Sequence, residues 1–312
     1  MSAIRKIPFS SILGWSSTRY DCFSICKRRY FYQYYSKYAA NPSSVPISRY
    51  KDLASVPLAI GSIVHSIIET LLHRLQTNAT TIESDKFFDY AVRSTEHALR
   101  TVPFDEVVYG VADRVSLEDV YPKIQRSLEN FLASDRFAWI TRVATGNAND
   151  WIIDPPGYGE TRLGDLKLYC KVDFLLPVNG VFHILDWKTG KPDAIKHRNQ
   201  LVGYASWASY HFDIDPSTVR PTIAYLHPDY KEMEEAFNTF DLESFAIQVR
   251  AETDEMYSHC RDVDGNIPVD QASFPMIDNS VICGMCAFRG LCYPASYQAN
   301  FATRNNPEVG SS

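Results

Sequence analysis

Apolar residues recur at helical spacing in several stretches of the first half of the chain. From Leu58 to Thr77, a segment that contains the run IGSIVHSIIETLLHRL, they return every three or four positions and predict a helix. Similar spacing predicts amphipathic helices over 84–100 and 116–134. The segment 16–38 contains neither Gly nor Pro and predicts one or two short helices, whereas 41–57 is rich in Ser and Pro and predicts a loop.

The pattern changes after Trp151, where shorter apolar runs take over. Residues 166–177 and 181–187 alternate or run apolar, and Asn179-Gly180 between them is a strong turn signal, so that these two runs predict a β-hairpin. Further elements are predicted in this order: a helix over about 194–212, a strand over 218–227 and a helix over 242–260. The succession predicts an α/β core with a helical insertion before the sheet.

Composition places the chain among packed globular proteins. Of its 312 residues, 45% are hydrophobic and 22% are charged, which excludes an intrinsically disordered chain and fits one large or two small domains. No stretch approaches about 18 uninterrupted apolar residues, and MSAIRKIPFS lacks the apolar core of a secretory signal. We therefore expect a cytoplasmic protein without a membrane segment.

Charge is unevenly distributed along the sequence. The whole chain has a net charge of −6, which argues against binding nucleic acid over its entire surface, but residues 1–38 carry seven basic residues and one acidic residue. Within them, Arg28 and Arg29 stand among tyrosines, a combination of phosphate-binding charge and stacking surface that suits single-stranded nucleic acid. The alternative is a solvated basic helix face whose aromatic side chains pack the core.

The predicted hairpin carries the residues with the clearest chemistry. Asp186 and Lys188 are two positions apart in FHILDWKTGKPD, so their side chains point to the same side of the strand, and Asp173 lies on the neighbouring strand. Charges at the end of an apolar strand are costly unless they are paired or bind a metal. Two carboxylates can hold Mg²⁺, and the lysine can then orient a water or balance phosphate charge. The simpler alternative is a solvated ion pair.

The cysteines form a second candidate site. There are seven, an odd number that argues against a disulfide framework, and three of them, Cys283, Cys286 and Cys292, follow one another as C-x2-C-x5-C. Three thiolates need a fourth ligand to close a site, and sulfur ligands select zinc or an iron–sulfur cluster. Buried free thiols are the remaining alternative, which is also our prediction for Cys170 and Cys260.

Four short motifs follow one another along the chain: GSIVH, KVD, LDWKTGK and QLVGY. Over roughly residues 15–295 this succession resembles the RecB-like branch of the PD-(D/E)XK nuclease superfamily. The resemblance implies a restriction-endonuclease-like α/β core, with a mixed central sheet flanked by helices and a helical insertion. It implies one nuclease domain over 1–300, with a helical part at 58–150 and the sheet core and active site at 151–230. The polar composition of 301–312 predicts a disordered tail.

The resemblance also assigns roles to residues of these motifs. It implies that Mg²⁺ or Mn²⁺ is held by His65, Asp173, Asp186 and the backbone carbonyl of Trp187. Lys188 would position the nucleophile. Gln200 and Tyr204 would position DNA or brace the site.

Part of this branch carries a 4Fe-4S cluster on one N-terminal and three C-terminal cysteines. Mapped here, the ligands are Cys26, Cys283, Cys286 and Cys292, which would join segments 16–38 and 275–295. Cys26 precedes Arg28, Arg29 and Tyr30, as in the family's Cys-Pro-Arg-Arg motif, although Lys27 replaces the proline. Cys22 competes for the role of fourth ligand.

The activity implied is metal-dependent hydrolysis of DNA phosphodiester bonds, as an exonuclease on single strands or free ends. One alternative is an end-processing subunit that works with a helicase or a CRISPR-adaptation integrase; the chain has no G-x-x-x-x-G-K-S/T loop, so any motor would be a separate protein. Another is a non-catalytic DNA-binding scaffold, against which the intact Asp173, Asp186 and Lys188 argue.

Overall fold

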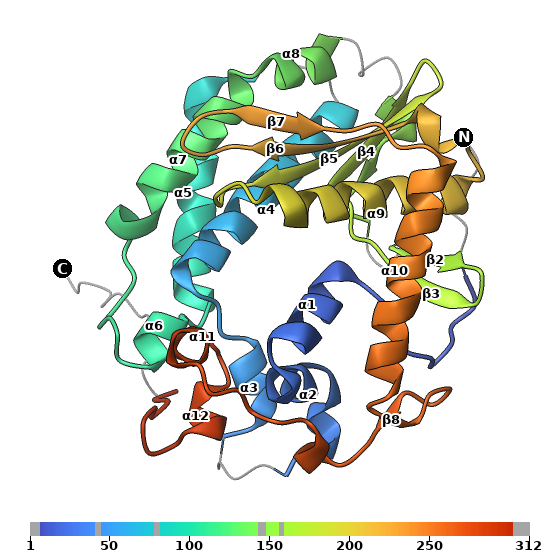
Figure 1. Cartoon of the computed structure of the whole chain (residues 1–312). Helices are drawn as coiled ribbons and strands as arrows, with labels where there is room; N and C mark the ends of the chain where they lie inside the picture. The colour runs from blue at the N-terminus through green and yellow to red at the C-terminus, as the bar shows by residue number, and fades with distance from the viewer. Residues whose placement is uncertain (1–6, 41–44, 78–81, 143–147, 156–158, 302–312) are drawn as a thin grey trace, which may run out of the picture. The chain divides into compact units, whose positions relative to one another are not determined.

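The computed structural model describes residues 7–40, 45–77, 82–142, 148–155 and 159–301 (Figure 1). The chain divides into unit 1, which comprises 1–20, 64–82 and 126–267, and unit 2, which comprises the remainder. Three of the five boundaries fall inside helices, namely α1 (Ser17–Ile25), α4 (Val56–Thr77) and α7 (Leu117–Leu132). The single domain over 1–300 and its subdivision stay predictions, and the predicted tail lies outside the described residues except for Phe301.

Unit 1 is built on a five-stranded mixed sheet in the order β1-β4-β5-β6-β7. β5 and β6 are parallel, and the other neighbours are antiparallel. The mixed central sheet flanked by helices that the sequence predicts is therefore confirmed. The strands are β1 (Ile152–Ile153), β4 (Phe174–Val178), β5 (Val181–Lys188), β6 (Val219–Tyr225) and β7 (Lys231–Glu234).

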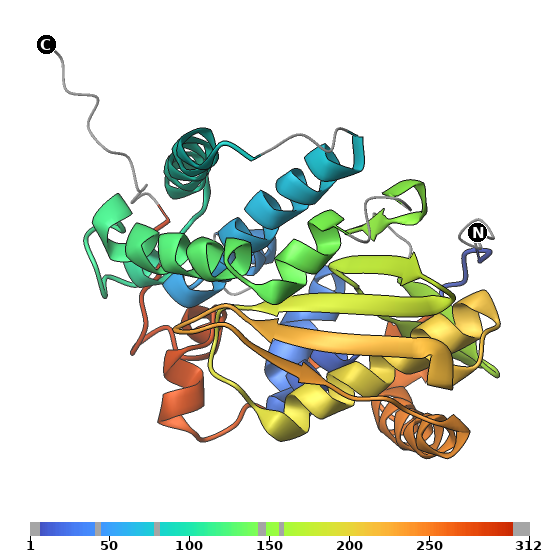
Figure 2. The same cartoon turned by 90° about the horizontal axis from the view of Figure 1, so that it is seen from above.

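Helices cover both faces of this sheet. α9 (Ala194–Phe212) connects the parallel strands β5 and β6 and packs on β6, and α10 (Thr239–Tyr257) packs against α9 (Figure 2). On the opposite face, Trp187 packs against Phe131 of α7, with ring centroids 5.0 Å apart, and His183 packs against Trp139 of α8 (Asp135–Arg142). The alternation along β5 thus turns Asp186 and Lys188 toward α9.

The predicted hairpin is present, with one correction. Asn179 and Gly180 both have positive φ, at 51° and 79°, as a two-residue turn between right-twisted strands requires. The predicted strand over 166–177 is wrong, because β3 (Leu166–Tyr169) pairs with β2 (Glu160–Leu163) in a separate two-stranded sheet and the main sheet resumes at β4. The break leaves Asp173 directly before β4, next to Trp187 of β5.

The part of unit 2 that the structure describes is mainly helical. It includes the ends of α1, α4 and α7 that do not belong to unit 1. Its aromatic core joins Tyr30, Phe31 and Tyr35 to Phe274, so the alternative of core packing holds for these aromatic side chains. A helix at 47–51 lies inside the predicted loop 41–57. The further helices are α2 (Lys27–Tyr35), α3 (Ile47–Lys51), α5 (Ser84–Thr101), α6 (Asp105–Val108), α11 (Ser280–Gly284) and α12 (Arg289–Cys292).

α4 is the one helix among the described residues that is long and apolar enough to cross a membrane. This finding concerns length and composition only, and a core helix of a soluble protein passes the same test. Buried positions of α4, such as Val64, Ile68 and Leu72, recur at helical spacing, which is the pattern of a helix that packs one face against a protein core.

Candidate active site

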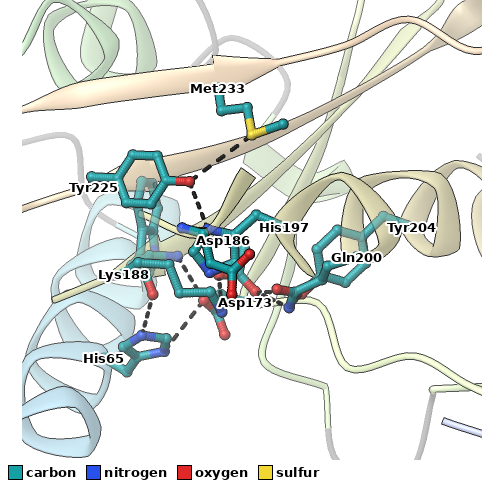
Figure 3. A network of polar contacts seen from close by, with 11 residues as sticks. His65, Asp173, Asp186, Lys188, His197, Gln200, Tyr204, Tyr225 and Met233 are labelled. Carbon is teal, nitrogen blue, oxygen red and sulfur yellow. Dashed lines mark hydrogen bonds and ion pairs between the residues drawn. The ribbon is translucent and has the colours of Figure 1, made fainter. Parts of the chain in front are cut away.

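His65 and Asp173 are joined to the backbone of β5 in unit 1. The Asp173 carboxylate accepts a hydrogen bond from the Trp187 N–H at 2.9 Å, and His65 Nδ1 lies 3.2 Å from the same oxygen (Figure 3). His65 Nε2 donates to the Trp187 carbonyl at 2.6 Å, since a carbonyl can only accept. The two predicted metal ligands therefore engage both backbone polar groups of Trp187, its N–H and its carbonyl.

This pair is electrostatically matched. Burial by itself lowers the pKa of His65, but the hydrogen bond and charge of Asp173 outweigh burial and the pKa is raised. Burial by itself raises the pKa of Asp173, and the hydrogen bond and charge of His65 reverse this shift, so that its pKa is lowered. In the absence of a metal the two shifts favour an imidazolium beside a carboxylate, so that a metal ion bound by His65 would have to displace a proton from its ring.

Asp186 occupies the centre of a second group of contacts. It is 3% exposed, and its Oδ2 accepts hydrogen bonds from Gln200 Nε2 at 2.9 Å and from the Tyr204 hydroxyl. Gln200 and Tyr204 are four residues apart on α9, so one helix face delivers both donors. The Lys188 ammonium lies 2.5 Å from the other carboxylate oxygen, Oδ1.

The environment of Asp186 disfavours its charge. Burial, followed by the charge of Asp173, raises the pKa of Asp186, and Lys188 offsets this only in part. Oδ1 is buried, and the group that faces it is the Lys188 ammonium, whose charge and hydrogen bond both lower the pKa of Asp186. A carboxylate oxygen has two lone pairs, so a metal ion at Oδ1 would share this oxygen with Lys188.

The structure thus brings His65, Asp173, Asp186, Lys188, Gln200 and Tyr204 into one polar network (Figure 3). Their roles, and that of the Trp187 carbonyl as a ligand, stay predictions. Two carboxylates, a carbonyl and an imidazole suit Mg²⁺ or Mn²⁺. Within the described ranges, however, no group of three or more His, Cys, Asp or Glu side chains is arranged to hold a metal ion.

Two polar residues beside this network were missed by the sequence analysis. His197 in the first turn of α9 contacts the hydroxyl of Tyr225 at the end of β6, and that hydroxyl lies 3.9 Å from the Met233 sulfur (Figure 3). Neither residue belongs to a recognised motif. Their position in the sequence could have identified them, because in a parallel pair of strands the end of β6 must lie beside the end of β5, where the site is.

In unit 2, four cysteines line one pocket: Cys26, Cys283, Cys286 and Cys292. The Cys26 sulfur, at the N-cap of α2, accepts the Arg29 N–H at 3.4 Å. Burial is the main cause that raises the pKa of Cys286, and it raises the pKa of Cys292 to about 12 with a further contribution from the neighbouring cysteines. The thiols of Cys286 and Cys292 are therefore protonated in the absence of a metal.

The two arginines predicted to bind DNA have local partners. Arg28 donates from Nε to the Phe274 carbonyl at 2.8 Å, which ties α2 to the C-terminal part of unit 2. Arg29 is exposed and lines the cysteine pocket. DNA contact by Arg28 and Arg29 stays a prediction.

Comparison with known proteins agrees with this architecture. The family model described as the PD-(D/E)XK nuclease superfamily matches residues 14–293. No curated protein matches the sequence. A solved structure titled "Crystal structure of SSO0001" is 14% identical, with a TM-score of 0.29, over 56% of this chain and 73% of that chain. By the match to the family model, the chain belongs to the PD-(D/E)XK nuclease superfamily.

Proposed function

We propose that this chain is a Mg²⁺- or Mn²⁺-dependent deoxyribonuclease of the RecB-like branch that degrades single-stranded DNA or DNA ends. One observation carries the proposal: His65 of α4, two aspartates and a lysine at the β4–β5 hairpin meet in one network around the backbone of Trp187. Members of the superfamily are nucleases and usually use Mg²⁺ or Mn²⁺, which agrees with the oxygen-rich donor set.

Each residue has a distinct task in this proposal. His65, Asp173, Asp186 and the Trp187 carbonyl would hold the metal ion, which when bound supplies a Lewis acid for the phosphate and lowers the pKa of a water. Lys188 orients that water and stabilises negative charge on the phosphate. Gln200 and Tyr204 fix the Asp186 carboxylate by donating to Oδ2, which leaves Oδ1 for the cation.

Cleavage of labelled single-stranded DNA with Mn²⁺ tests the proposal. We expect wild-type protein to shorten the strand and Asp186→Ala and Lys188→Met to leave it intact. Lys231→Met is the matched control, since Lys231 is an exposed lysine of β7, and it should cleave normally. Equal cleavage by wild type, Asp186→Ala and Lys188→Met would refute the assignment.

Blocked substrates separate an exonuclease from an endonuclease. Strands blocked at the 5′ end, at the 3′ end or at both, together with a circular single strand and a duplex, would be digested side by side. Protection of the circle and of one blocked end supports the exonuclease. Cutting of the circular strand contradicts end dependence while leaving the nuclease intact.

The proposal includes a 4Fe-4S cluster on Cys26, Cys283, Cys286 and Cys292. The cluster is supported by the pocket that all four cysteines line. Cys22 does not line this pocket; it is buried, and burial raises its pKa to about 11. We expect brown protein with absorbance near roughly 400 nm when it is purified without oxygen. Cys26→Ser should lose the iron and Cys22→Ser should keep it. Colourless protein loaded with zinc would exclude the cluster.

A further inference from the structure

His197 and Tyr225 form a nearly buried polar pair that the proposed mechanism does not use. They are 7% and 5% exposed, and His197 Nδ1 lies 2.6 Å from the Tyr225 hydroxyl (Figure 3). His197 comes from the first turn of α9 and Tyr225 from the last position of β6, so the contact joins the helix to the sheet edge where the active-site network lies.

The hydrogen bonds define the protonation of His197. Its Nδ1 also accepts the backbone N–H of Asp193 at 3.2 Å, and a backbone N–H can only donate. Nδ1 therefore carries no proton, the ring is neutral with its proton on Nε2, and the Tyr225 hydroxyl is the donor in the short contact. The pKa shifts agree: burial and then Lys188 lower the pKa of His197, while burial and nearby aspartates raise that of Tyr225.

Strand register places this pair beside Lys188. Lys188 and Tyr225 are partners in the parallel β5–β6 ladder, and the Leu226 N–H donates to the Lys188 carbonyl at 2.8 Å. Partner residues in adjacent strands project from the same face, so the Tyr225 ring stands next to the lysine stem. That stem has four flexible carbons, and its ammonium lies against Asp186.

We propose that His197 and Tyr225 are positioning residues for Lys188, an inference that rests on the proposed nuclease function. His197 fixes the tyrosine ring, and the ring restricts the lysine stem. Because both partners are neutral, they offer the ammonium no competing charge, and it stays at Asp186, where the proposed mechanism needs it. The pair acts through Lys188 and touches neither the metal nor the substrate.

A double-mutant cycle on cleavage tests the coupling. Tyr225→Phe and His197→Leu should each lower kcat about tenfold, within the range expected for a misplaced catalytic group, with KM for DNA and the Mn²⁺ requirement unchanged. The double variant should lose no more than either single one, because both break the same contact. His197→Asn, which keeps an acceptor near the place of Nδ1, should recover most of kcat. Additive losses, or unchanged kcat in both single variants, would overturn the proposal.

Control variants, and a measurement that does not require cleavage, separate the test of this inference from the test of the proposed nuclease function. Two controls should behave as wild type: Tyr210→Phe, at an exposed position of α9, and His73→Leu on α4. Acetylation of Lys188, followed by mass spectrometry, should be severalfold faster in Tyr225→Phe and His197→Leu than in wild type or His197→Asn. Unchanged acetylation in all variants would refute the positioning role even if the wild type cleaves no DNA, an outcome that would separately refute the nuclease.

Discussion

The active-site network of unit 1 and the cysteine pocket of unit 2 are organised in opposite ways. In the network, the charged side chains hold one another: His65 faces Asp173, and Lys188 faces Asp186. In the pocket, the four cysteine side chains form no such charge pairs with one another, burial raises the pKa of Cys286 and Cys292, and the position of the segment depends on other residues. The clearest of these is Arg289, which is 3% exposed between the last two cysteines of the motif.

Arg289 shows how the pocket is supported. Its guanidinium donates to both carboxylate oxygens of Asp105 on α6, at 2.8 and 2.7 Å, and to the Cys286 carbonyl at 2.9 Å, and it lies 3.5 Å from the centre of the Tyr109 ring. A bidentate pair of this kind fixes a loop firmly. The cysteine segment is thus held by its surroundings, whereas the active-site charges compensate one another. We infer that changes in the network affect activity most and changes around the pocket affect stability most.

The largest expected effect is on activity. Asp186→Asn keeps the shape of the side chain but removes the charge that would hold a cation, so cleavage of single-stranded DNA should fall about a thousandfold or more. Asp229→Asn, at an exposed aspartate near Arg126, is the matched control and should cleave normally. Retention of activity in Asp186→Asn at ordinary Mn²⁺ concentrations would remove Asp186 from the metal site.

The next effect is on stability and belongs to the other region. Arg289→Met leaves the Asp105 carboxylate partly buried without its cation, and breaking a buried pair in this way costs about 3–5 kcal/mol in free energy of unfolding. Chemical denaturation of both proteins measures the difference. Arg250→Met breaks an exposed pair with Asp165 and should lower the free energy of unfolding far less, because surface ion pairs contribute little to stability. Equal costs for Arg289→Met and Arg250→Met would contradict the distinction drawn here.

Much of the fold could be predicted because its signals are local. The helix predicted over 194–212 coincides with α9, which begins after the N-cap Asp193, and the turn at Asn179-Gly180 adopts the positive φ angles that these residues favour. β7 was missed because its sequence, KEME, has no apolar alternation and becomes a strand only by pairing with β6. The predicted strand over 166–177 is too long, because the break within it arises from the pairing of β3 with β2, which local sequence does not reveal.

In the candidate site, too, some residues could be predicted from local sequence and others depend on tertiary pairing. Asp173, Asp186 and Lys188 could be named from their positions on the predicted hairpin, and His65 through the resemblance to a known family, and the four do come together in space. His197 could not, because a single histidine three residues before Gln200 carries no signal of its own. Its significance appears only when strand register places Tyr225 beside Lys188. Contacts that depend on tertiary pairing are invisible to local patterns.

A smaller effect should follow from the His65–Asp173 pair. The raised pKa of His65 stabilises the fold fully below its unfolded value near 6.5, and this contribution is lost as pH rises through the folded pKa. The lowered pKa of Asp173 contributes above its unfolded value near 3.9 and is lost as pH falls. His65→Gln should therefore lower the unfolding free energy by about 1 kcal/mol between roughly pH 5 and 6, and by less above pH 8. A difference independent of pH would exclude the charged pair.

The smallest effect has the opposite sign and concerns Asp186, the other carboxylate of the active-site network. Because the pKa of Asp186 is raised in the folded protein, its charge opposes folding: stability from this group is present below its unfolded pKa near 3.9 and declines as pH rises. Asp186→Asn should therefore raise the unfolding free energy by about 0.5 kcal/mol at pH 7 without metal, and this gain should vanish near pH 3. Thermal melts of metal-free protein at both pH values measure it. Destabilisation at pH 7 would show that Lys188 compensates Asp186 fully, and the carboxylate would then have no excess charge to offer a cation.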